Sequence, residues 1–344
     1  MHKKTFASDN YSGVHPAVMQ ALLKANTGHA ASYGADEYTA DAIEKLKALF
    51  GKDTSVYLVY NGTGANVLGL QTLTQSFHSI LCSDLAHINV DESTAPEKFL
   101  GCKLIPVSAP NGKMTAQAIE QRIQRLDDQH HAQARVISLS QSTEYGTVYT
   151  VEELQQIAAV AKKYDLFFHM DGSRISNAAV SLKTEFARFT RDVGVDVLSF
   201  GGTKNGMMFG EAVIIFNPEI ARYFKFFRKQ GMQLHSKMRF IGAQFSALLT
   251  NNLWESNAAH SNQMARLLEE ELRKFPEIRI TQSVDANGVF AIFPQNIIEP
   301  LQQQNFFYVW NERTNEVRLM CSFDTTESEI RDFAARLRLE LVSA

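Results

Sequence analysis

The chain has few cysteines, and those it has do not form pairs. Cys82, Cys102 and Cys321 are scattered through 344 residues, and their odd number and spacing match neither a disulfide framework nor a metal site. We therefore expect reduced, partly buried thiols in a cytoplasmic protein. Long apolar runs are missing too. No segment approaches the roughly 18 uninterrupted apolar residues of a membrane span, and residues 1–10 lack the apolar stretch of a signal peptide. We expect no membrane partner.

A strong excess of one charge is also absent. The 34 Lys and Arg side chains against 37 Asp and Glu leave a formal net charge of −3, and basic residues run no further than pairs such as Lys162-Lys163. This balance gives no electrostatic footprint for nucleic acid, so we expect no nucleic-acid partner. With 45% hydrophobic and 21% charged residues, the composition is that of an ordinary globular protein. The length predicts two domains.

Apolar runs alternate with helix-period stretches through the first two thirds of the chain. The runs predict buried strands at Ser55–Tyr60, Ser79–Ser83, Lys103–Val107, Arg135–Leu139, Leu166–Met170 and Asp196–Phe200. Such alternation indicates an α/β fold with a mainly parallel sheet covered on both faces. Only about ten residues separate Phe200 from the next strand, Glu211–Phe216, which is short for a parallel crossover. We therefore expect that one strand to be antiparallel.

Helix signals and a change of pattern divide the chain. Thr39–Phe50 is amphipathic, and capping-box spacings open helices at Thr150 and Thr326. From about residue 221, helical patterns (Ala221–Lys229, Ser236–Asn251, Glu255–Lys274) lead into short strands at Val289–Phe293, Phe306–Trp310 and Val317–Cys321. We predict a large domain over residues 1–252 and a small α+β domain over 253–344. The N-terminal segment, residues 1–30, could pack with either part, including the small domain.

Polar residues follow the predicted strands, where ligands bind in open α/β sheets. The first such turn, Gly62-Thr63-Gly64, precedes a helix, so its backbone N–H groups and the helix dipole form an anion site. The third glycine comes late for a dinucleotide fingerprint, and one phosphate fits better than a pyrophosphate. A simple tight turn is the alternative interpretation of this turn alone.

Two further strand ends carry an acid and a lysine. Asp171 could be the N-cap of a following helix, or a carboxylate that keeps a heteroaromatic nitrogen protonated. His169 and Asp171 could face the same way as a metal pair, but no third ligand accompanies them and we predict no metal. Lys204 is either a solvated loop lysine or, if desolvated in its Gly-flanked turn, a nucleophilic amine. The conjunction of phosphate turn, aspartate and lysine is more specific than any member of it.

At these positions the sequence resembles the L-threonine aldolase and β-eliminating-lyase family, which are fold type I enzymes dependent on pyridoxal 5'-phosphate (PLP). The match covers most of the chain. It rests on these segments: Ser8-Asp9, Tyr33-Gly34-x-Asp36, Asn61-Gly62-Thr63-Gly64-Ala65-Asn66, His87, Asp171-Gly172-Ser173-Arg174, Lys204-Asn205-Gly206, Met238-Arg239 and Val317-Arg318-Leu319.

The resemblance implies a role for each matching position. Lys204 would form the internal aldimine, Asp171 would pair with the pyridine nitrogen, and Arg174 would lie near the phenolic oxygen. Gly62 and Thr63 would hold the phosphate, and His87 would stack on the ring and assist proton transfer. The substrate carboxylate would be received by Ser8, Arg239 and Arg318, because the guanidinium fork suits a carboxylate.

The chain departs from the family pattern at two places. Gln141-Ser142-Thr143-Glu144 stands where the family commonly has Glu-Asn-Thr-His, and Ala35 replaces a common acid. The missing histidine is one that many members use to meet the substrate hydroxyl. The catalytic base is therefore open between His87, Glu144 and an ordered water. The divergence points to another aldehyde preference, such as the aromatic one of phenylserine aldolases.

The resemblance implies aldol cleavage of a β-hydroxy-L-amino acid, of the threonine, allo-threonine or phenylserine type, to glycine and an aldehyde. Another PLP-dependent β-elimination, racemisation or transamination is the nearest alternative, because the shared cofactor site does not fix which Cα bond breaks. A nicotinamide-dependent oxidoreductase and a catalytically silent PLP-binding paralogue are the others. By analogy with family members we expect a homo-oligomer, a dimer or homotetramer, with a small-molecule amino acid as substrate.

Overall fold

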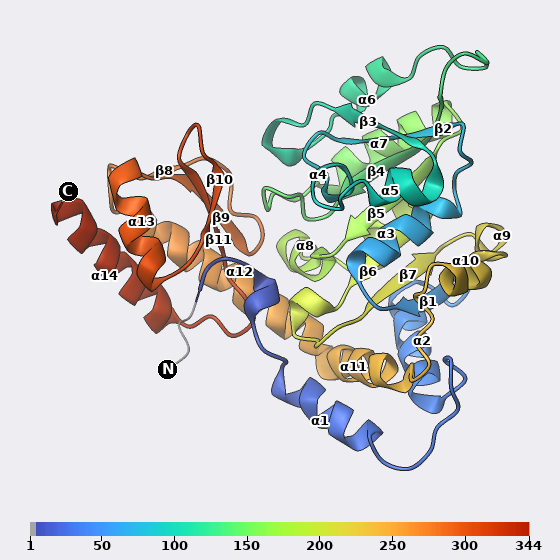
Figure 1. Cartoon of the computed structure of the whole chain (residues 1–344), viewed down its shortest axis with the longest axis horizontal. Coiled ribbons are helices and arrows are strands. Elements are labelled where there is room, and N and C mark those ends of the chain that lie inside the picture. Colours follow the sequence, from blue (N-terminus) through green and yellow to red (C-terminus); the bar gives the residue numbers. More distant parts are fainter. Residues whose placement is uncertain (1–4, 344) are drawn as a thin grey trace.

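The computed structural model describes residues 5–343, which form two sheets, each with its own apolar core (Figure 1). Residues 1–4 of the predicted N-terminal segment and Ala344 lie outside the described residues. Within residues 5–343, no helix has both the length and the apolar character needed to cross a membrane.

The larger sheet has seven strands in the order β1-β7-β6-β5-β4-β2-β3. Its strands are β1 (Ser55–Val59), β2 (His78–Ser83), β3 (Lys103–Val107), β4 (Gln133–Ser140), β5 (Phe167–Gly172), β6 (Val197–Gly201) and β7 (Glu211–Ile215). The strands from β2 to β6 pair in parallel, whereas β7 runs antiparallel to both β6 and β1. The predicted antiparallel strand is confirmed, since the link after β6 has room only for the turn η5 (Thr203–Asn205).

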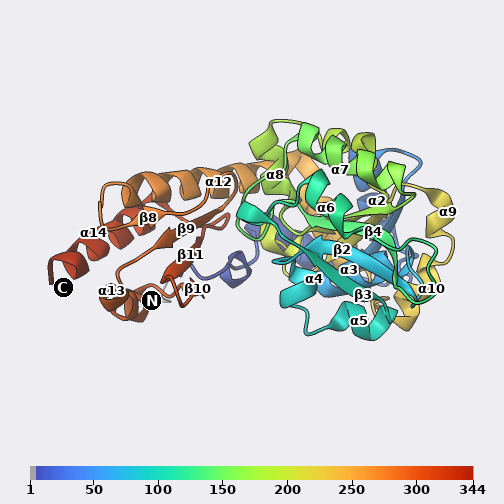
Figure 2. The ribbon, with the colours of Figure 1, turned by 90° about the horizontal axis from the view of Figure 1, so that it is seen from above.

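Helices cover both faces of this sheet (Figure 2). One face packs against α2 (Glu37–Phe50), α7 (Val151–Lys163) and α11 (Arg239–Leu249), which contribute Leu46, Ile157 and Phe245 to the shared core. The opposite face packs against α3 (Gly62–Gln71), α5 (Ala95–Leu100) and α10 (Phe224–Gln230). The remaining helices of this part are α4 (His87–Val90), α6 (Ala116–Arg122), α8 (Ile175–Leu182) and α9 (Pro218–Ala221), with short turns at η2 (Pro110–Gly112), η3 (Phe186–Phe189), η4 (Arg191–Val193) and η6 (Thr250–Asn252).

The capping signals predicted helix starts correctly. At α7 the Thr150 side chain accepts from the Glu153 N–H, and the Glu153 side chain accepts from the Thr150 N–H. The same reciprocal pair joins Thr326 and Glu329 at the start of α14 (Glu327–Ser343). The helix predicted over residues 221–229 corresponds to α10, which begins three residues later than predicted, and Ala221 ends the separate helix α9. The break between α9 and α10 accompanies the packing of the buried Phe224 ring against Tyr57, with ring centroids 4.6 Å apart.

The smaller sheet is antiparallel, with strand order β10-β11-β9-β8. It consists of β8 (Arg279–Ile280), β9 (Gly288–Ile292), β10 (Tyr308–Asn311) and β11 (Glu316–Met320), and it packs with α12 (Leu253–Leu272), α13 (Gln295–Gln304) and α14. The long helix α12 joins the two parts (Figure 2). Its Trp254 belongs to the core of the large sheet and its Leu268 to that of the small one. The domain boundary at residue 252 stays a prediction.

The N-terminal segment contacts both parts. Phe6 lies in the core of the small sheet, its N–H donates to the Phe306 carbonyl at 3.0 Å, and its carbonyl accepts from the Met320 N–H at 2.7 Å. The turn η1 (Asp9–Tyr11) then leads to α1 (Pro16–Ala25), which packs against α11 of the large part. The chain therefore passes over the junction of the two sheets before it enters the larger one (Figure 1).

Candidate active site

Five strand ends bring the predicted residues to one edge of the large sheet. Gly62 follows β1, His87 follows β2, Glu144 follows β4, Asp171 lies near the end of β5, and Lys204 follows β6. These strands all run in one direction, because β1 is antiparallel to β7 just as β6 is. Their carboxyl ends therefore meet at the same edge, which is where ligands bind in open α/β sheets.

A cavity of about 420 Å³ lies between this edge and the small sheet. Six of the predicted site residues line it: Ser8, His87, Glu144, Arg174, Lys204 and Arg318. The other lining residues are Asn10, Tyr11, Asp91, Tyr308, Val309 and Trp310. The volume suits a small-molecule ligand, and its walls come from the N-terminal segment, the large sheet and the small sheet together.

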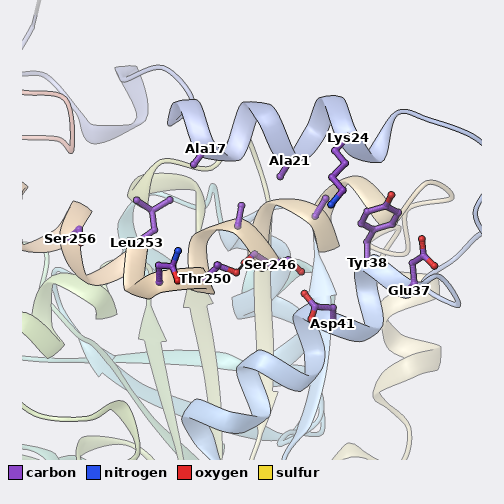
Figure 3. A pocket seen from close by; sticks show the side chains of 13 residues that line it. Ala17, Ala21, Lys24, Glu37, Tyr38, Asp41, Ser246, Thr250, Leu253 and Ser256 are labelled. Carbon is purple, nitrogen blue, oxygen red and sulfur yellow. Dashed lines mark hydrogen bonds between the residues drawn. The ribbon is translucent and has the colours of Figure 1, made fainter.

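A second hollow, of about 670 Å³, lies elsewhere, between α1, α2 and α11. Figure 3 shows Ala17 and Ala21 on one side of it and Asp41 and Ser246 on the other. None of its lining residues is among the predicted site residues. The cavity at the strand ends, although smaller, is therefore the candidate active site.

Lys204 belongs to the η5 turn and lines the cavity, where charged groups surround it. Burial, and then the positive charge of Arg174, lower the pKa of the Lys204 ammonium, against the opposing charges of Asp9, Asp171 and Glu211. A lowered pKa increases the neutral, nucleophilic fraction of the amine near pH 7. Beneath the turn, Glu211 accepts a 2.7 Å hydrogen bond from the Gly202 N–H, which fixes the backbone just before Lys204.

Asp171 is a buried carboxylate, and its hydrogen-bond donors within residues 5–343 are neutral. Its Oδ2 accepts from the Asn66 amide at 2.8 Å, and its Oδ1 accepts from the Ser173 N–H at 2.9 Å. Burial opposes ionisation, but the charges of His87 and Lys204 and these hydrogen bonds outweigh it and lower the pKa of Asp171. The N-cap of α8 is Arg174, so the capping interpretation of Asp171 is wrong.

His169, on the same strand, faces no metal-like cluster. Its ring nitrogens lie 2.9 Å from the Ser138 hydroxyl and 3.3 Å from the Ser199 hydroxyl. Burial lowers the pKa of His169 to about 4, so the ring is neutral and held between two strand neighbours. Among residues 5–343, no group of three or more His, Cys, Asp and Glu side chains is placed to hold a metal ion.

Arg174 is held by an acid that the sequence did not assign. Asp9 accepts from Arg174 Nε at 2.7 Å and from its Nη2 at 2.9 Å, and it also accepts from the Asn287 amide at 3.1 Å. Burial opposes the ionised forms, but the mutual attraction lowers the pKa of Asp9 to about 2 and raises that of Arg174. The bidentate geometry is specific to a guanidinium. Asp9 thus fixes Arg174 from the N-terminal segment.

Arg318 enters from the small sheet between two rings. Its guanidinium carbon lies 4.9 Å from the Trp310 ring centroid and 5.4 Å from that of Tyr308, and its Nη2 donates to the Ala7 carbonyl at 3.3 Å. Its buried Nε has no partner among residues 5–343. Burial and the positive charge of the neighbouring Arg174 lower the pKa of Arg318. The guanidinium is therefore a partly desolvated cation that an anionic ligand would stabilise.

The structure does not bring every predicted residue into the cavity, since its lining excludes Asp171, Gly62, Thr63 and Arg239. Gly62 and Thr63 lie at the start of α3, one helical turn before Asn66, whose amide reaches Asp171. Thr63 itself lines a neighbouring hollow with Gly64. Arg239 begins α11, and its guanidinium donates to the Gly28 carbonyl at 3.2 Å instead of lining the cavity.

The residues present fit PLP. Lys204 offers an amine to an aldehyde, and the buried Asp171 carboxylate, which has no ion-pair partner at bonding distance within residues 5–343, suits a protonated pyridine nitrogen. A Cβ built on Gly62 would meet nothing within 4 Å, so the backbone at the start of α3 is open to an anion. Amine, carboxylate and anion site are the three attachments that this cofactor needs.

Comparison with known proteins agrees with this chemistry. Residues 5–295 match the family described as β-eliminating lyase. Low specificity L-threonine aldolases from Pseudomonas sp. and Pseudomonas aeruginosa are each 42% identical to the chain, over 97% and 98% of it and 96% and 98% of their own lengths. A solved structure of threonine aldolase from Leishmania major superimposes with a TM-score of 0.92, at 29% identity, covering 98% of this chain and 99% of that one.

The fold and the cavity thus define a fold type I, PLP-dependent enzyme, as the sequence predicted. The chain belongs to the β-eliminating lyase family. PLP is the cofactor of that family, so the predicted cofactor and the lyase class are confirmed, whereas the individual residue roles stay predictions.

Proposed function

We propose that this protein cleaves the Cα–Cβ bond of a β-hydroxy-L-amino acid and releases glycine and an aldehyde. The observation that carries the proposal is the convergence of Lys204, Arg318, Glu144 and His87 on the wall of one cavity, with the buried Asp171 carboxylate near enough for the charges of His87 and Lys204 to lower its pKa. The 42% identity to named low specificity L-threonine aldolases over nearly the whole chain supports it.

The cofactor, when bound, supplies the electron sink that stabilises a carbanion at Cα. In our proposal Lys204 holds its aldehyde carbon, Asp171 its pyridine nitrogen, Arg174 its phenolic oxygen, and the backbone of Gly62 and Thr63 its phosphate. The ionised state of Asp171, supported by the Asn66 and Ser173 donors, is the state this role requires.

Product analysis tests the proposal directly. Purified protein with PLP is incubated with L-threonine, L-allo-threonine or L-phenylserine, and glycine and the aldehyde are quantified. We expect equal amounts of both products. Pyruvate or another 2-oxo acid with ammonia would instead indicate elimination or transamination, and inversion at Cα would indicate racemisation; either result would reject aldol cleavage.

We further propose that aromatic aldehydes are accepted beside acetaldehyde. Tyr11, Tyr308 and Trp310 line the cavity, and the Tyr11 and Tyr308 hydroxyls lie 2.8 Å apart. Such rings offer apolar area to a phenyl group. Comparing kcat/KM for L-phenylserine and L-threonine tests this preference.

Arg318, assisted by Ser8, is proposed to receive the substrate carboxylate. Arg318→Lys keeps the charge but loses the guanidinium fork and its stacking between Tyr308 and Trp310. We expect KM to rise about 10- to 100-fold, the equivalent of one hydrogen bond to a charged group, with a smaller change in kcat. Steady-state kinetics measure both, with the exposed Arg313→Lys as matched control. An unchanged KM would remove Arg318 from the carboxylate site.

Glu144 is the proposed base for the substrate hydroxyl. Its Oε1 accepts from the Ser140 hydroxyl at 2.6 Å and from the backbone N–H of His87 at 2.9 Å. Burial raises the pKa of the Glu144 carboxyl. A base must be ionised, so kcat/KM falls as pH falls through this raised pKa. Glu144→Gln is expected to remove that limb of the pH profile and lower kcat about 10²- to 10⁴-fold. The exposed Glu152→Gln serves as control; a variant at Glu144 that keeps both rate and limb would assign the base to His87 or to water.

Assembly and location complete the proposal. We propose a cytoplasmic homo-oligomer, a dimer or tetramer. Arg239 lies outside the cavity of its own chain, so the carboxylate-binding role predicted for it would require a neighbouring copy. Cys82, Cys102 and Cys321 are all free and buried, as suits a reducing compartment. Sedimentation analysis of the purified protein tests the oligomer.

A further inference from the structure

Glu92 is a buried acid next to the cavity-lining His87, and no role has been assigned to it above. The Glu92 side chain is 0% exposed, and it follows the short helix α4 that begins at His87. The two residues after it, Ser93 and Thr94, both have left-handed backbone conformations, with φ of 47° and 59°. Such conformations are costly for non-glycine residues and persist where surrounding structure imposes them. The chain thus maintains a strained turn beside a desolvated carboxylate.

One oxygen of Glu92 joins two parts of the site. Glu92 Oε1 lies 2.9 Å from His87 Nδ1, and it accepts from the Asn66 amide nitrogen at 3.0 Å. The same amide nitrogen donates to Asp171 Oδ2 at 2.8 Å. An asparagine amide has two hydrogens, and here both are used, one on each carboxylate. Glu92 is therefore connected to His87 directly and to Asp171 through Asn66.

The contact determines what His87 presents to the cavity. A carboxylate can only accept, so His87 Nδ1 carries a proton, and Nε2 is the ring nitrogen left for a ligand. The His87 side chain is 41% exposed and lines the cavity. The hydrogen bond to Glu92 raises the pKa of His87; burial and Lys204 oppose this, and Asp171 supports it. Asp91, Glu144 and Arg174 are further ionisable groups that line the cavity.

We propose that Glu92 is a positioning residue that holds His87 with its proton on Nδ1 and, through Asn66, orients the Asp171 carboxylate. The inference deepens the proposed function, on which it rests, because it assigns how the two groups predicted to contact the cofactor are oriented together. A histidine backed by a carboxylate is held in one tautomer and one ring orientation.

A purely structural role does not account for the cost of this arrangement. Glu92 Oε2 and Asn66 Oδ1 are both buried, and neither has a partner among residues 5–343. Unpaired buried polar atoms destabilise a fold, and a desolvated carboxylate does so more strongly. An apolar side chain at position 92 would fill the space without that cost, which favours a role for the Glu92 carboxylate beyond packing.

The test uses the side-chain nitrogen NMR signals of His87 in the protein without cofactor. His87→Gln identifies its signals among the 10 histidines. In the wild-type protein, above its titration, we expect the neutral ring to carry its proton on Nδ1. In Glu92→Gln, which keeps the shape and removes the charge, we expect His87 to titrate at lower pH. Glu97→Gln, an acid on neighbouring α5, is the matched control and should leave the titration unchanged.

Kinetics of the loaded enzyme give the second readout. We expect Glu92→Gln to lower kcat about 10- to 100-fold, the scale of effect known for carboxylates that orient metal-bound histidines, while KM changes little. Glu92→Asp, which restores the charge, should recover part of the loss. Because the wild-type tautomer is read without any change at Glu92, the test survives a Glu92→Gln protein that fails to fold.

The outcomes separate this inference from the proposed function. A neutral His87 with its proton on Nε2, or an identical His87 titration in Glu92→Gln, would overturn the inference even if the enzyme releases glycine and aldehyde. Wild-type protein that shows the expected tautomer but forms no glycine would instead overturn the proposed function.

Discussion

Lys204→Ala is expected to reduce aldol cleavage to the limit of detection. Burial and the nearby Arg174 lower the pKa of the lysine ammonium, so the wild-type amine is available as a nucleophile near neutral pH. Alanine removes the amine and leaves the Gly202 backbone anchored by Glu211. Among residues 5–343 no other lysine lines the cavity, so none of these amines replaces it.

Two measurements on the same samples check this result. The absorption spectrum of the wild-type protein with PLP should show the band of a lysine-linked cofactor, and the variant should show that of the free aldehyde. Lys183→Ala, at the end of α8 and outside the cavity, is the control and should retain both band and turnover. Substantial turnover by Lys204→Ala would reject the covalent role.

Asp171→Asn is expected to have the second-largest effect. Asparagine is nearly isosteric, and its single side-chain oxygen can still accept from either Asn66 or Ser173, so most of the packing near β5 should survive. Asparagine cannot stabilise a positive charge on the pyridine nitrogen, because its side chain carries no negative charge. We expect kcat to fall about 10²- to 10³-fold, the scale of losing one preorganised electrostatic contact.

Cofactor affinity separates this role from a structural one. The dissociation constant for PLP, measured by fluorescence quenching, should change much less than kcat. Asp196→Asn is a matched control, because Asp196 is a half-buried carboxylate beside β6 that accepts from the Phe168 backbone N–H at 2.8 Å and does not line the cavity. An Asp171→Asn enzyme with wild-type kcat would show that Asp171 does not act on the cofactor.

Local signals in the sequence predicted much of the fold. Apolar runs located the strands of the large sheet, and the short link after Phe200 predicted the antiparallel β7. Thr150 and Thr326 predicted two helix starts because a capping box lies within four residues of chain. The two-residue strand β8 gave no such signal, since it is too short for an alternating pattern.

The groups that support the site could not be predicted in the same way. Asp9 meets Arg174 across 165 positions of chain, and Asn66 meets Asp171 across 105. Such pairs form only when the sheet and the N-terminal segment are assembled, so one sequence carries no local sign of them. Glu92 lies five residues after His87, and that spacing after a strand was the one signal that could have suggested it.

Arg239 illustrates the limit of transferring a role by resemblance. The Met238-Arg239 segment matched the family pattern, yet in this chain the guanidinium donates to the Gly28 carbonyl beside α1. The role proposed for it needs a second copy of the chain, and a sequence does not specify how copies are arranged. Its predicted role therefore depends on the assembly, whereas that of Arg318 depends on contacts within one chain.

Reductive trapping tests the central claim most directly. Borohydride treatment of the wild-type protein with PLP fixes the cofactor on whichever lysine binds it, and peptide mass spectrometry then locates the label. We predict one phosphopyridoxyl group, on Lys204. A label on another lysine, or none on a protein that releases glycine and aldehyde, would contradict the account.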